Sequence, residues 1–249
     1  MKLIIKPARK EYNQEIGRTI IYSKAAEWLV DENQDFNCKF GGVTKKELQK
    51  DSFKIGKETF YVLPAQFVDE YKRIERNAQI ITLKDVGAII SSTGLNKESR
   101  VLDAGTGSGA LACYLAKICK EVISIDIEKE NTETGKRNAK NLEIKNIKFK
   151  TEDITKTKEK DFDVFCLDIP ETWKAFGTAS KAIKRGGFLI TYTPQIEQAM
   201  KTVRQAPKDL ILKEVKEVDE QKWVIDDKRS KPLKNDLGHT AFLTVFRKI

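Results

Sequence analysis

Three glycines alternate with other small residues in the segment 105–109, and the acid Asp103 stands just before them. Glycine lacks a β-carbon, so the backbone here can turn tightly and approach a bound molecule closely. The residues that follow have helical periodicity, and the first turn of a helix offers unpaired amides to an anion. The segment therefore predicts a site for a small molecule that carries a carboxylate or a phosphate.

The glycine spacing separates two kinds of cofactor. Dinucleotide enzymes favour G-x-G-x-x-G, whereas residues 105–109 have the pattern G-x-G-x-G after an acid. This pattern indicates S-adenosylmethionine, whose methionyl ammonium Asp103 would help to hold. The alternatives are a domain that binds a nicotinamide cofactor and a relic domain that binds none.

Two further acids follow predicted strands. Asp126 ends the second strand, where an acid is suited to ribose hydroxyls. Asp153 follows the third strand, where it is suited either to an adenine amino group or to an ordinary helix cap. The predicted cofactor-binding residues are Gln79, Asp103, Gly105, Gly107, Ser108, Gly109, Ala110, Leu111, Asp126, Ile127, Asn131, Asp153 and Asp168.

A carboxylate and an aromatic ring end two more apolar strands. Asp168 follows the apolar run 164–167, so it should lie at the carboxyl edge of the sheet, where ligands of such folds bind. There a fixed carboxylate can orient an amino group and stabilise a developing positive charge; the alternative is a cap for the next helix. Tyr192 should lie at the same edge, with its ring stacked on a base or packed in the core. We predict that Asp168 and Tyr192 are catalytic.

The elements that would position these residues alternate along the chain. Apolar strands that alternate with helices predict a parallel sheet covered on both faces, and two consecutive strands at the end predict an antiparallel pair. The expected fold is α/β: a Rossmann-like class I methyltransferase domain over residues 71–249, with a seven-stranded sheet and helices on both faces. Strands are predicted at 100–104, 122–127, 147–150, 162–169, 188–192, 210–218 and 239–246, and helices at 84–93, 109–120, 128–142, 173–184 and 195–204.

The first part of the chain has a different pattern. Short β-like runs at 3–5, 19–22 and 59–63 are separated by turn signals that include several glycines. They predict a small β-rich N-terminal module over residues 1–70.

Composition limits the partners. The chain of 249 residues has a formal net charge of +9, which attracts polyanions, although a solvated lysine surface explains the charge equally well. The four cysteines form no C-x-x-C pair and His239 is the only histidine, so no metal site is expected. Since no apolar run is long enough to cross a membrane, the expected location is the cytoplasm.

Several segments together resemble the TrmI family of tRNA (adenine-N1)-methyltransferases. The more specific ones are D-x-P-x-x-W at 168–173 and G-H-T-A-F-L at 238–243; segments 76–85, 101–111 and 192–198 add to them. The resemblance implies methylation of adenine 58 in the T-loop of tRNA, and of position 57 as well in archaeal members. It also implies a homo-oligomer, typically a tetramer, with Asp168 as the catalytic aspartate. The chain departs from the family at Thr82, which is often aromatic there, at 83–85, where it has Leu-Lys-Asp and the family usually has Pro-Lys-Asp, and at Gln195, which is commonly asparagine.

A basic segment between the last two strands is the candidate RNA contact. The family resemblance favours phosphate binding by Lys228, Arg229, Lys231 and Lys234, and a solvated loop is the alternative. His239 is expected to have a structural role or to contact RNA.

Two other functions compete with the tRNA methyltransferase. One is a non-catalytic tRNA-binding subunit, against which the intact glycine segment and Asp168 argue. The other is a methyltransferase of the same fold that acts on a small molecule or a protein, since the fold alone does not fix the function. The basic charge and segment 238–243 argue against that alternative.

Overall fold

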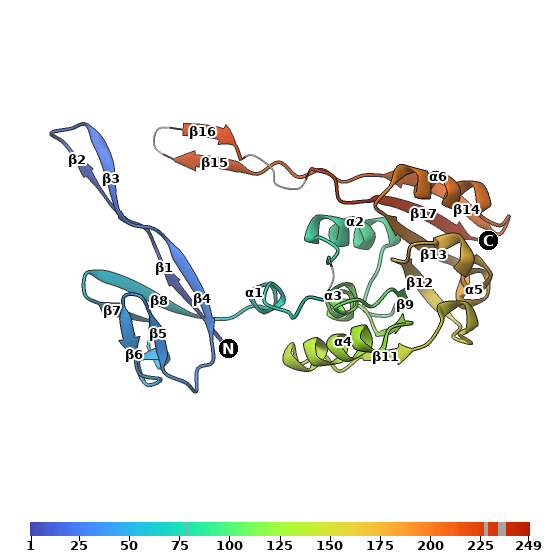
Figure 1. Cartoon of the computed structure of the whole chain (residues 1–249), viewed down its shortest axis with the longest axis horizontal. Helices are drawn as coiled ribbons and strands as arrows, with labels where there is room; N and C mark the ends of the chain where they lie inside the picture. Colours follow the sequence, from blue (N-terminus) through green and yellow to red (C-terminus); the bar gives the residue numbers. More distant parts are fainter. Residues whose placement is uncertain (78, 227–228, 234–237) are drawn as a thin grey trace. The chain divides into compact units, whose positions relative to one another are not determined.

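The computed structural model describes residues 1–77, 79–226, 229–233 and 238–249. The chain divides into two compact units, Met1–Arg73 and Ile74–Ile249 (Figure 1). In the described residues, no helix is both long enough and apolar enough to span a bilayer.

The first unit is rich in β-structure, as predicted. Its main sheet has four antiparallel strands in the order β4-β1-β8-β7, and β2–β3 and β5–β6 form separate two-stranded sheets. Ile4, Leu48 and Phe60 are fully buried in its core. The elements are β1 Lys2–Lys6, β2 Arg9–Asn13, β3 Arg18–Ser23, β4 Ala26–Val30, β5 Phe36–Cys38, β6 Gly41–Val43, the 3₁₀ turn η1 Glu47–Gln49, β7 Ser52–Ile55, β8 Glu58–Pro64 and α1 Phe67–Tyr71.

The second unit contains the predicted seven-stranded sheet. The strand order is β11-β10-β9-β12-β13-β17-β14; the first five strands are parallel, and β17 runs antiparallel between β13 and β14. Its strands are β9 Arg100–Ala104, β10 Glu121–Asp126, β11 Ile147–Thr151, β12 Phe162–Leu167, β13 Ile183–Thr193, β14 Leu210–Lys216 and β17 Phe242–Lys248. Its helices are α2 Leu83–Thr93, α3 Ala110–Ala116, α4 Lys129–Asn141, α5 Phe176–Ala182 and α6 Ile196–Gln205, with 3₁₀ turns η2 Ile154–Lys156 and η3 Thr172–Ala175.

Each face of this sheet has its own core. Val101 of β9 packs with residues of α2 and α3 on one face, whereas Leu102 packs with residues of α5 on the other. Both faces of the central strands are therefore buried, which explains why their sequences are continuously apolar rather than alternating. Cys113, Cys119 and Cys166 are buried free thiols in this unit.

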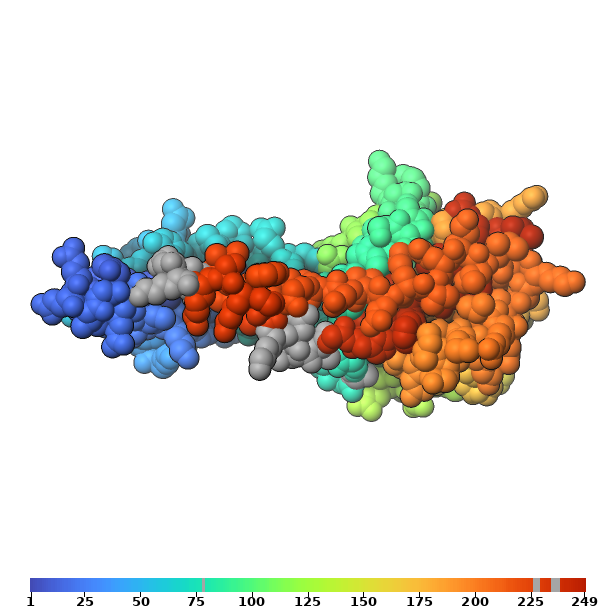
Figure 2. All heavy atoms as spheres, turned by 90° about the horizontal axis from the view of Figure 1, so that it is seen from above, coloured from blue at the N-terminus to red at the C-terminus, as the bar shows by residue number. Residues whose placement is uncertain are grey.

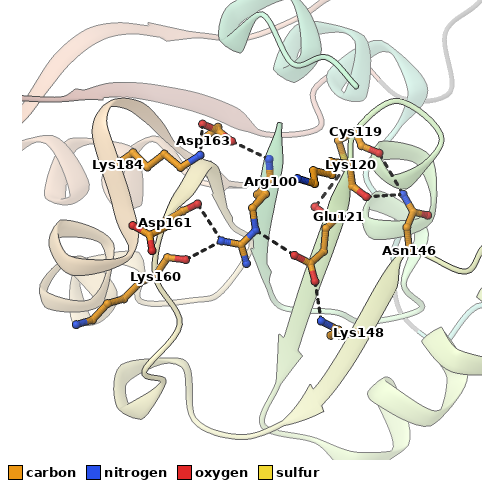
Figure 3. Close-up of polar contacts among 10 residues, drawn as sticks. All are labelled: Arg100, Cys119, Lys120, Glu121, Asn146, Lys148, Lys160, Asp161, Asp163 and Lys184. Atoms are coloured by element: carbon orange, nitrogen blue, oxygen red, sulfur yellow. Dashed lines mark hydrogen bonds and ion pairs between the residues drawn. The ribbon is translucent and has the colours of Figure 1, made fainter. Parts of the chain in front are cut away.

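Polar contacts join the N-terminal ends of the parallel strands, opposite the edge that ends in Asp126 and Asp168. The Arg100 guanidinium donates to Glu121 Oε2 at 3.0 Å and to the carbonyls of Lys160 and Asp161 at 3.1 Å each (Figure 3). The Arg100 amide donates to Asp163 Oδ2 at 2.8 Å. Lys148 pairs with Glu121, and Lys184 pairs with Asp163. We call the ten residues drawn in Figure 3 the Arg100 belt: Arg100, Cys119, Lys120, Glu121, Asn146, Lys148, Lys160, Asp161, Asp163 and Lys184. The belt ties the start of β9 to its neighbours in the sheet.

Helix α2 lies beside the edge strand β14. The Ser92 hydroxyl donates to Glu214 Oε1 at 3.2 Å and accepts from Lys216 Nζ at 2.5 Å. In the space-filling view of Figure 2, green atoms of this part of the chain lie next to orange atoms at the surface of the unit. The N-terminal end of α2 lies near the chain that leaves β14, because Lys84 Nζ donates to the Val218 carbonyl at 2.6 Å.

Three predicted elements differ in the structure. The predicted helix 173–184 is a 3₁₀ turn followed by α5, and β13 begins at Ile183 instead of residue 188. Ile183 pairs with Phe162 and Phe188 pairs with Val164, so an irregularity in the sheet accommodates the extra residues. The basic segment was expected to be a loop, but Arg229–Pro232 forms strand β16, which pairs with β15, Trp223–Asp226.

Candidate active site

A cavity of about 750 Å3 lies at the carboxyl edge of the parallel strands. This is the edge where open α/β sheets bind ligands, and the volume suits a molecule of cofactor size. Eight of the residues predicted to bind cofactor line it, and so does Tyr192. The eight are Gln79, Gly105, Gly107, Asp126, Ile127, Asn131, Asp153 and Asp168.

The glycine segment forms one wall of the cavity. Gly105 has φ +93°, and a β-carbon there would lie 2.0 Å from the Asp168 carbonyl oxygen. Gly109 has φ +72° and would bring a β-carbon to 2.8 Å from the Cα of Gly135. Gly107 has φ +50° but no atom within 4 Å, so the space in front of it is open. Two of the glycines thus permit close backbone packing, and the third faces free space.

Asp103 lies behind the segment and does not line the cavity. It is 1% exposed, and its Oδ2 accepts a hydrogen bond of 2.6 Å from the Ser124 hydroxyl. Its Oδ1 is buried and has no partner among the described residues. Burial, together with the charges of Asp168 and Asp126, raises the pKa of Asp103 to about 7 despite the Ser124 hydrogen bond. A buried carboxylate oxygen without a hydrogen-bond partner is suited to accept from a cationic group of a ligand.

Four other predicted residues also lie off the cavity surface. Ser108, Gly109, Ala110 and Leu111 do not line it, although Ser108 supports the site indirectly. The Ser108 hydroxyl accepts from the Asn77 amide at 3.0 Å, and its carbonyl accepts from Asn138 Nδ2 at 2.8 Å. These bonds hold the segment that precedes Gln79 against the glycine segment and α4.

Asp126 organises the middle of the cavity. Its Oδ2 accepts from the Gly107 amide at 3.0 Å and from Asn131 Nδ2 at 3.1 Å, while Oδ1 accepts from the Glu128 amide at 2.9 Å. The carboxylate therefore fixes the glycine segment and the start of α4 at once. Ile127, beside it, is 69% exposed and presents an apolar surface to the cavity.

Asp153 has the geometry of a helix cap and also lines the cavity. Its Oδ1 accepts from the amide and the hydroxyl of Thr155, at 2.9 and 2.8 Å, and caps η2. These bonds lower the pKa of Asp153. The cap does not use Oδ2, which lies 3.7 Å from the exposed ammonium of Lys156, so the cap and an adenine contact through Oδ2 are compatible in the same side chain.

Asp168 is fixed through its backbone. Its amide donates to the Ala104 carbonyl at 2.8 Å, whereas its carboxylate has no hydrogen-bond partner among the described residues. Burial, and then the charge of Asp126, raises the pKa of Asp168 to about 7. The turn that follows has Glu171 at its N-cap position, so Asp168 is not the helix cap that was its alternative role.

Tyr192 and His239 lie on either side of the loop after β13. Tyr192 lines the cavity, and its hydroxyl donates to Asp85 Oδ2 at 3.0 Å. His239 Nε2 lies 2.7 Å from the Pro194 carbonyl, and Nδ1 lies 2.6 Å from Glu217 Oε1. Because both ring nitrogens face acceptors, these contacts raise the pKa of His239. The histidine thus secures Pro194, a residue of the cavity wall.

Comparisons with known proteins identify the family. Residues 95–236 match a family described as a methyltransferase domain. The tRNA (adenine(58)-N(1))-methyltransferase TrmI of Thermus thermophilus is 33% identical to the chain over 189 residues, which are 73% of this chain and 74% of that protein. The chain belongs to the TrmI family of methyltransferases. A second TrmI, the tRNA (adenine(57)-N(1)/adenine(58)-N(1))-methyltransferase of Methanocaldococcus jannaschii, is 29% identical over 92% of this chain and 94% of its own length.

Solved structures agree on the fold. The TrmI tRNA (m1A58) methyltransferase of Aquifex aeolicus matches with a TM-score of 0.78 at 24% identity, over 100% of this chain and 97% of that one. An S-adenosylmethionine-dependent O-methyltransferase of Thermotoga maritima has the same TM-score at 20% identity, over 100% of this chain and 92% of that one. At these identities the likeness shows the class I methyltransferase fold of the TrmI-family chain.

The predicted RNA-contacting residues of this TrmI-family chain do not lie together in the described structure. Arg229 and Lys231 are exposed on β16, whereas His239 contacts the carbonyl of Pro194, a residue of the cavity wall. Lys228 and Lys234 fall outside the described residues. Within the described ranges, no group of three or more His, Cys, Asp or Glu side chains is arranged to hold a metal ion.

Sequence analysis missed a polar group that contacts Tyr192. Asp85 and Lys84, at the start of α2, and Thr240, just before β17, form it together with Thr82. Segment 76–85 was part of the family resemblance, but the resemblance assigned no role to Lys84 or Asp85. The adjacent acid and base at the start of an apolar helix were the other signal, and such pairs are also common at solvated helix ends.

Proposed function

We propose that the protein transfers a methyl group from S-adenosylmethionine to N1 of adenine 58 in the T-loop of tRNA. The observation that carries the proposal is the carboxylate of Asp168, which lies in the cavity beside the glycine segment and has no hydrogen-bond partner in the part of the chain that the structure describes. The choice of substrate rests on the TrmI relatives of T. thermophilus and M. jannaschii, whose names specify N1 of adenine 58 in tRNA. A non-catalytic subunit has no need of such a carboxylate.

The residues of the site fit S-adenosylmethionine. The buried Oδ1 of Asp103 has no partner within the described ranges and suits the methionyl ammonium, and the open space at Gly107 admits a ligand close to the backbone. Asp126 lies at the end of β10, where its carboxylate suits the ribose hydroxyls, and Asp153 suits the adenine amino group through its Oδ2. When bound, S-adenosylmethionine supplies an electrophilic methyl group.

The residues of the chain then have limited tasks in the reaction. Adenine N1 has an in-plane lone pair and needs no general base before it attacks. The Asp168 carboxylate would accept a hydrogen bond from the exocyclic N6 amine, which orients N1, and its negative charge would stabilise the positive charge that develops on the base. Because a T-loop adenine is buried in the folded tRNA, it must leave its stack first, and the Tyr192 ring would then form a wall for it.

The proposal also covers the contact with tRNA outside the target base and the oligomeric state of the protein. Arg229 and Lys231 on β16, with Lys228 and Lys234, would bind tRNA phosphates and extend the contact beyond the target base. On the family resemblance we also propose a homotetramer that acts in the cytoplasm. Sedimentation of the purified protein tests the tetramer.

The experiment is mass spectrometry of unmodified tRNA after incubation with the protein and S-adenosylmethionine. The expected result is 1-methyladenosine at position 58, and the same spectra report whether position 57 is also methylated. Transfer to no tRNA, with S-adenosylmethionine still bound in a calorimetric assay, would favour a small-molecule or protein substrate. Binding of tRNA without binding of S-adenosylmethionine would favour the non-catalytic subunit.

A further inference from the structure

The Tyr192 hydroxyl belongs to a buried polar cluster that surrounds the Asp85 carboxylate. Asp85 is 0% exposed, and its Oδ2 accepts from the hydroxyls of Tyr192 at 3.0 Å, Thr240 at 2.8 Å and Thr82 at 2.9 Å. Three hydroxyl groups thus converge on one carboxylate oxygen. They come from three parts of the unit: the end of β13, the segment before β17 and the residue before α2.

Lys84 completes the cluster from the other side. Its ammonium lies 3.0 Å from Asp85 Oδ1, and it also donates to the Thr240 hydroxyl at 2.7 Å and to the Val218 carbonyl at 2.6 Å. The Lys84 side chain is only 10% exposed, so the charge of Asp85 is balanced inside the protein. A buried carboxylate with a cation on one oxygen and hydroxyls on the other is fully satisfied and rigid.

This cluster determines what the Tyr192 side chain can do. A phenol has one O–H to donate, and Asp85 takes it. Burial, and then the charge of Asp85, raises the pKa of Tyr192, so the phenol stays neutral. The hydroxyl is therefore unavailable as a donor or a base toward the cavity, and the ring is the part of Tyr192 that a substrate meets.

We propose that Asp85, held by Lys84, is a positioning residue that fixes the Tyr192 ring at the cavity wall. The proposal rests on the function proposed above, because the ring is positioned for the extruded adenine. It assigns a task to two residues at the start of α2 that do not themselves line the cavity. The tyrosine would otherwise be free to rotate, and a displaced wall would misplace the base relative to Asp168.

The competing explanation is that the cluster only stabilises the fold. Removal of one partner of a buried ion pair destabilises a protein whatever the pair does in catalysis. The experiment therefore changes the hydrogen bond from both ends and compares rates with stabilities. Tyr192→Phe removes the hydroxyl and keeps the ring, Asp85→Ala removes the acceptor, and Asp85→Asn keeps an acceptor oxygen without the charge.

Single-turnover methyl transfer to tRNA is measured for the wild type, these three variants and Tyr192→Phe/Asp85→Ala, at a temperature where each is folded. Tyr192→Phe and Asp85→Ala should each slow the reaction by roughly tenfold, an intermediate loss for a modest misplacement. The double variant should be no slower than the slower single variant, because both changes break the same bond. Asp85→Asn should recover part of the rate, and calorimetric affinity for S-adenosylmethionine should change less than about threefold.

Thr93→Val is the matched control. Thr93 is also on α2 and also buried, and its hydroxyl donates to the Ile89 carbonyl at 2.8 Å, far along the helix from Asp85. This variant should lose stability without losing rate. A wild-type rate for Tyr192→Phe would overturn the proposal even if Asp85→Ala failed to fold, and so would a roughly hundredfold loss in the double variant. A wild type that transfers no methyl group to tRNA would overturn the proposed function, and this proposal with it.

Discussion

Asp103 uses one carboxylate oxygen to accept a hydrogen bond of 2.6 Å from the Ser124 hydroxyl, while its other oxygen is buried without a partner in the described structure. Ser124 is held in turn by the Thr106 hydroxyl at 2.7 Å. One oxygen of the acid is thus anchored in the sheet. Under the function proposed above, the methionyl ammonium would approach the other oxygen and offset the cost of a buried carboxylate.

Replacement of Asp103 by asparagine should stabilise the ligand-free protein at high pH. The pKa of Asp103 is raised to about 7 from 3.8, so between these values the folded state binds a proton that the unfolded state releases. Stability is therefore lost as the pH rises through this window. We expect Asp103→Asn to melt several degrees above the wild type at pH 8 and to show little gain at pH 4, as measured by calorimetry without ligand.

The same variant should bind S-adenosylmethionine at least tenfold more weakly, since the amide lacks the charge that pairs with an ammonium. A variant that is more stable at pH 8 but binds the donor normally would show that Asp103 does not contact the ligand. Unchanged melting at both values of pH would contradict the raised pKa.

Replacement of Asp168 tests the proposed mechanism. Asp168→Ala should slow methyl transfer by roughly two to three orders of magnitude, the scale of one preorganised electrostatic group. Asp168→Asn should be nearly as slow, because it keeps an acceptor oxygen but lacks the charge. Single-turnover assays on tRNA measure both rates, and affinity for S-adenosylmethionine should fall much less because Asp126 and the glycine segment are intact.

The pH dependence of the wild type provides a second test of Asp168. Its pKa is raised to about 7, and the protonated form lacks the negative charge that the reaction needs. The rate at saturating tRNA should therefore fall as the pH is lowered from 8 to 6. A near-wild-type rate for Asp168→Ala, or a pH profile that Asp168→Ala leaves unchanged, would rule out the proposed role.

Substitutions at two glycines with similar backbone geometry distinguish the effect of backbone strain from the effect of a lost ligand contact. Gly107 and Gly94 have φ values of +50° and +64°, and neither has an atom within 4 Å of a built β-carbon. Valine at either position should cost a few kcal/mol through the left-handed backbone. Only Gly107→Val should abolish calorimetric binding of S-adenosylmethionine. Equal affinities in the two folded variants would contradict the assignment of the glycine segment to the donor.

The hairpin β15–β16 is expected to contribute to the salt dependence of tRNA binding. Lys231 is exposed on β16, and Lys228 precedes that strand in the sequence. Lys228→Gln/Lys231→Gln should weaken tRNA binding and make the slope of log affinity against log salt shallower by roughly one to two.

Lys97→Gln/Lys160→Gln is the control for this measurement. Both lysine side chains are exposed at the starts of parallel strands: Lys97 precedes β9, and Lys160, a residue of the Arg100 belt that contributes only its carbonyl, precedes β12 (Figure 3). Their removal should leave the slope unchanged. Equal slopes for the hairpin variant and the wild type would mean that the hairpin lysines are only solvated.

Local patterns in the sequence predicted most of the fold. The glycine segment, the acid after β10 and the apolar run before Asp168 each depend on a few consecutive residues, and the structure brings Gly105, Asp126 and Asp168 to one cavity. The start of β13 was missed because it depends on pairing with Phe162 across an irregular register. β16 was missed because a basic strand in a two-stranded sheet has no apolar alternation to predict it.

The predicted site was incomplete for a different reason. The hydroxyl contacts of Asp85 link residues that are 107 and 155 positions apart in the chain. A local sequence pattern cannot predict these contacts, because they form only when α2, β13 and the segment before β17 pack together. Asp103 shows the opposite case: its place in the motif was evident, but the sequence could not show that it lies behind the cavity wall.

The Arg100 belt has a consequence for how this protein can diverge. It ties the sheet together at the strand starts, and no residue of the belt lines the cavity at the strand ends. Substitutions at cavity-side positions such as Pro194 or Gln198 therefore leave the belt intact. Substitutions around the cavity can therefore change the substrate during evolution while the contacts at the strand starts are kept. Intermediate sequences then remain folded.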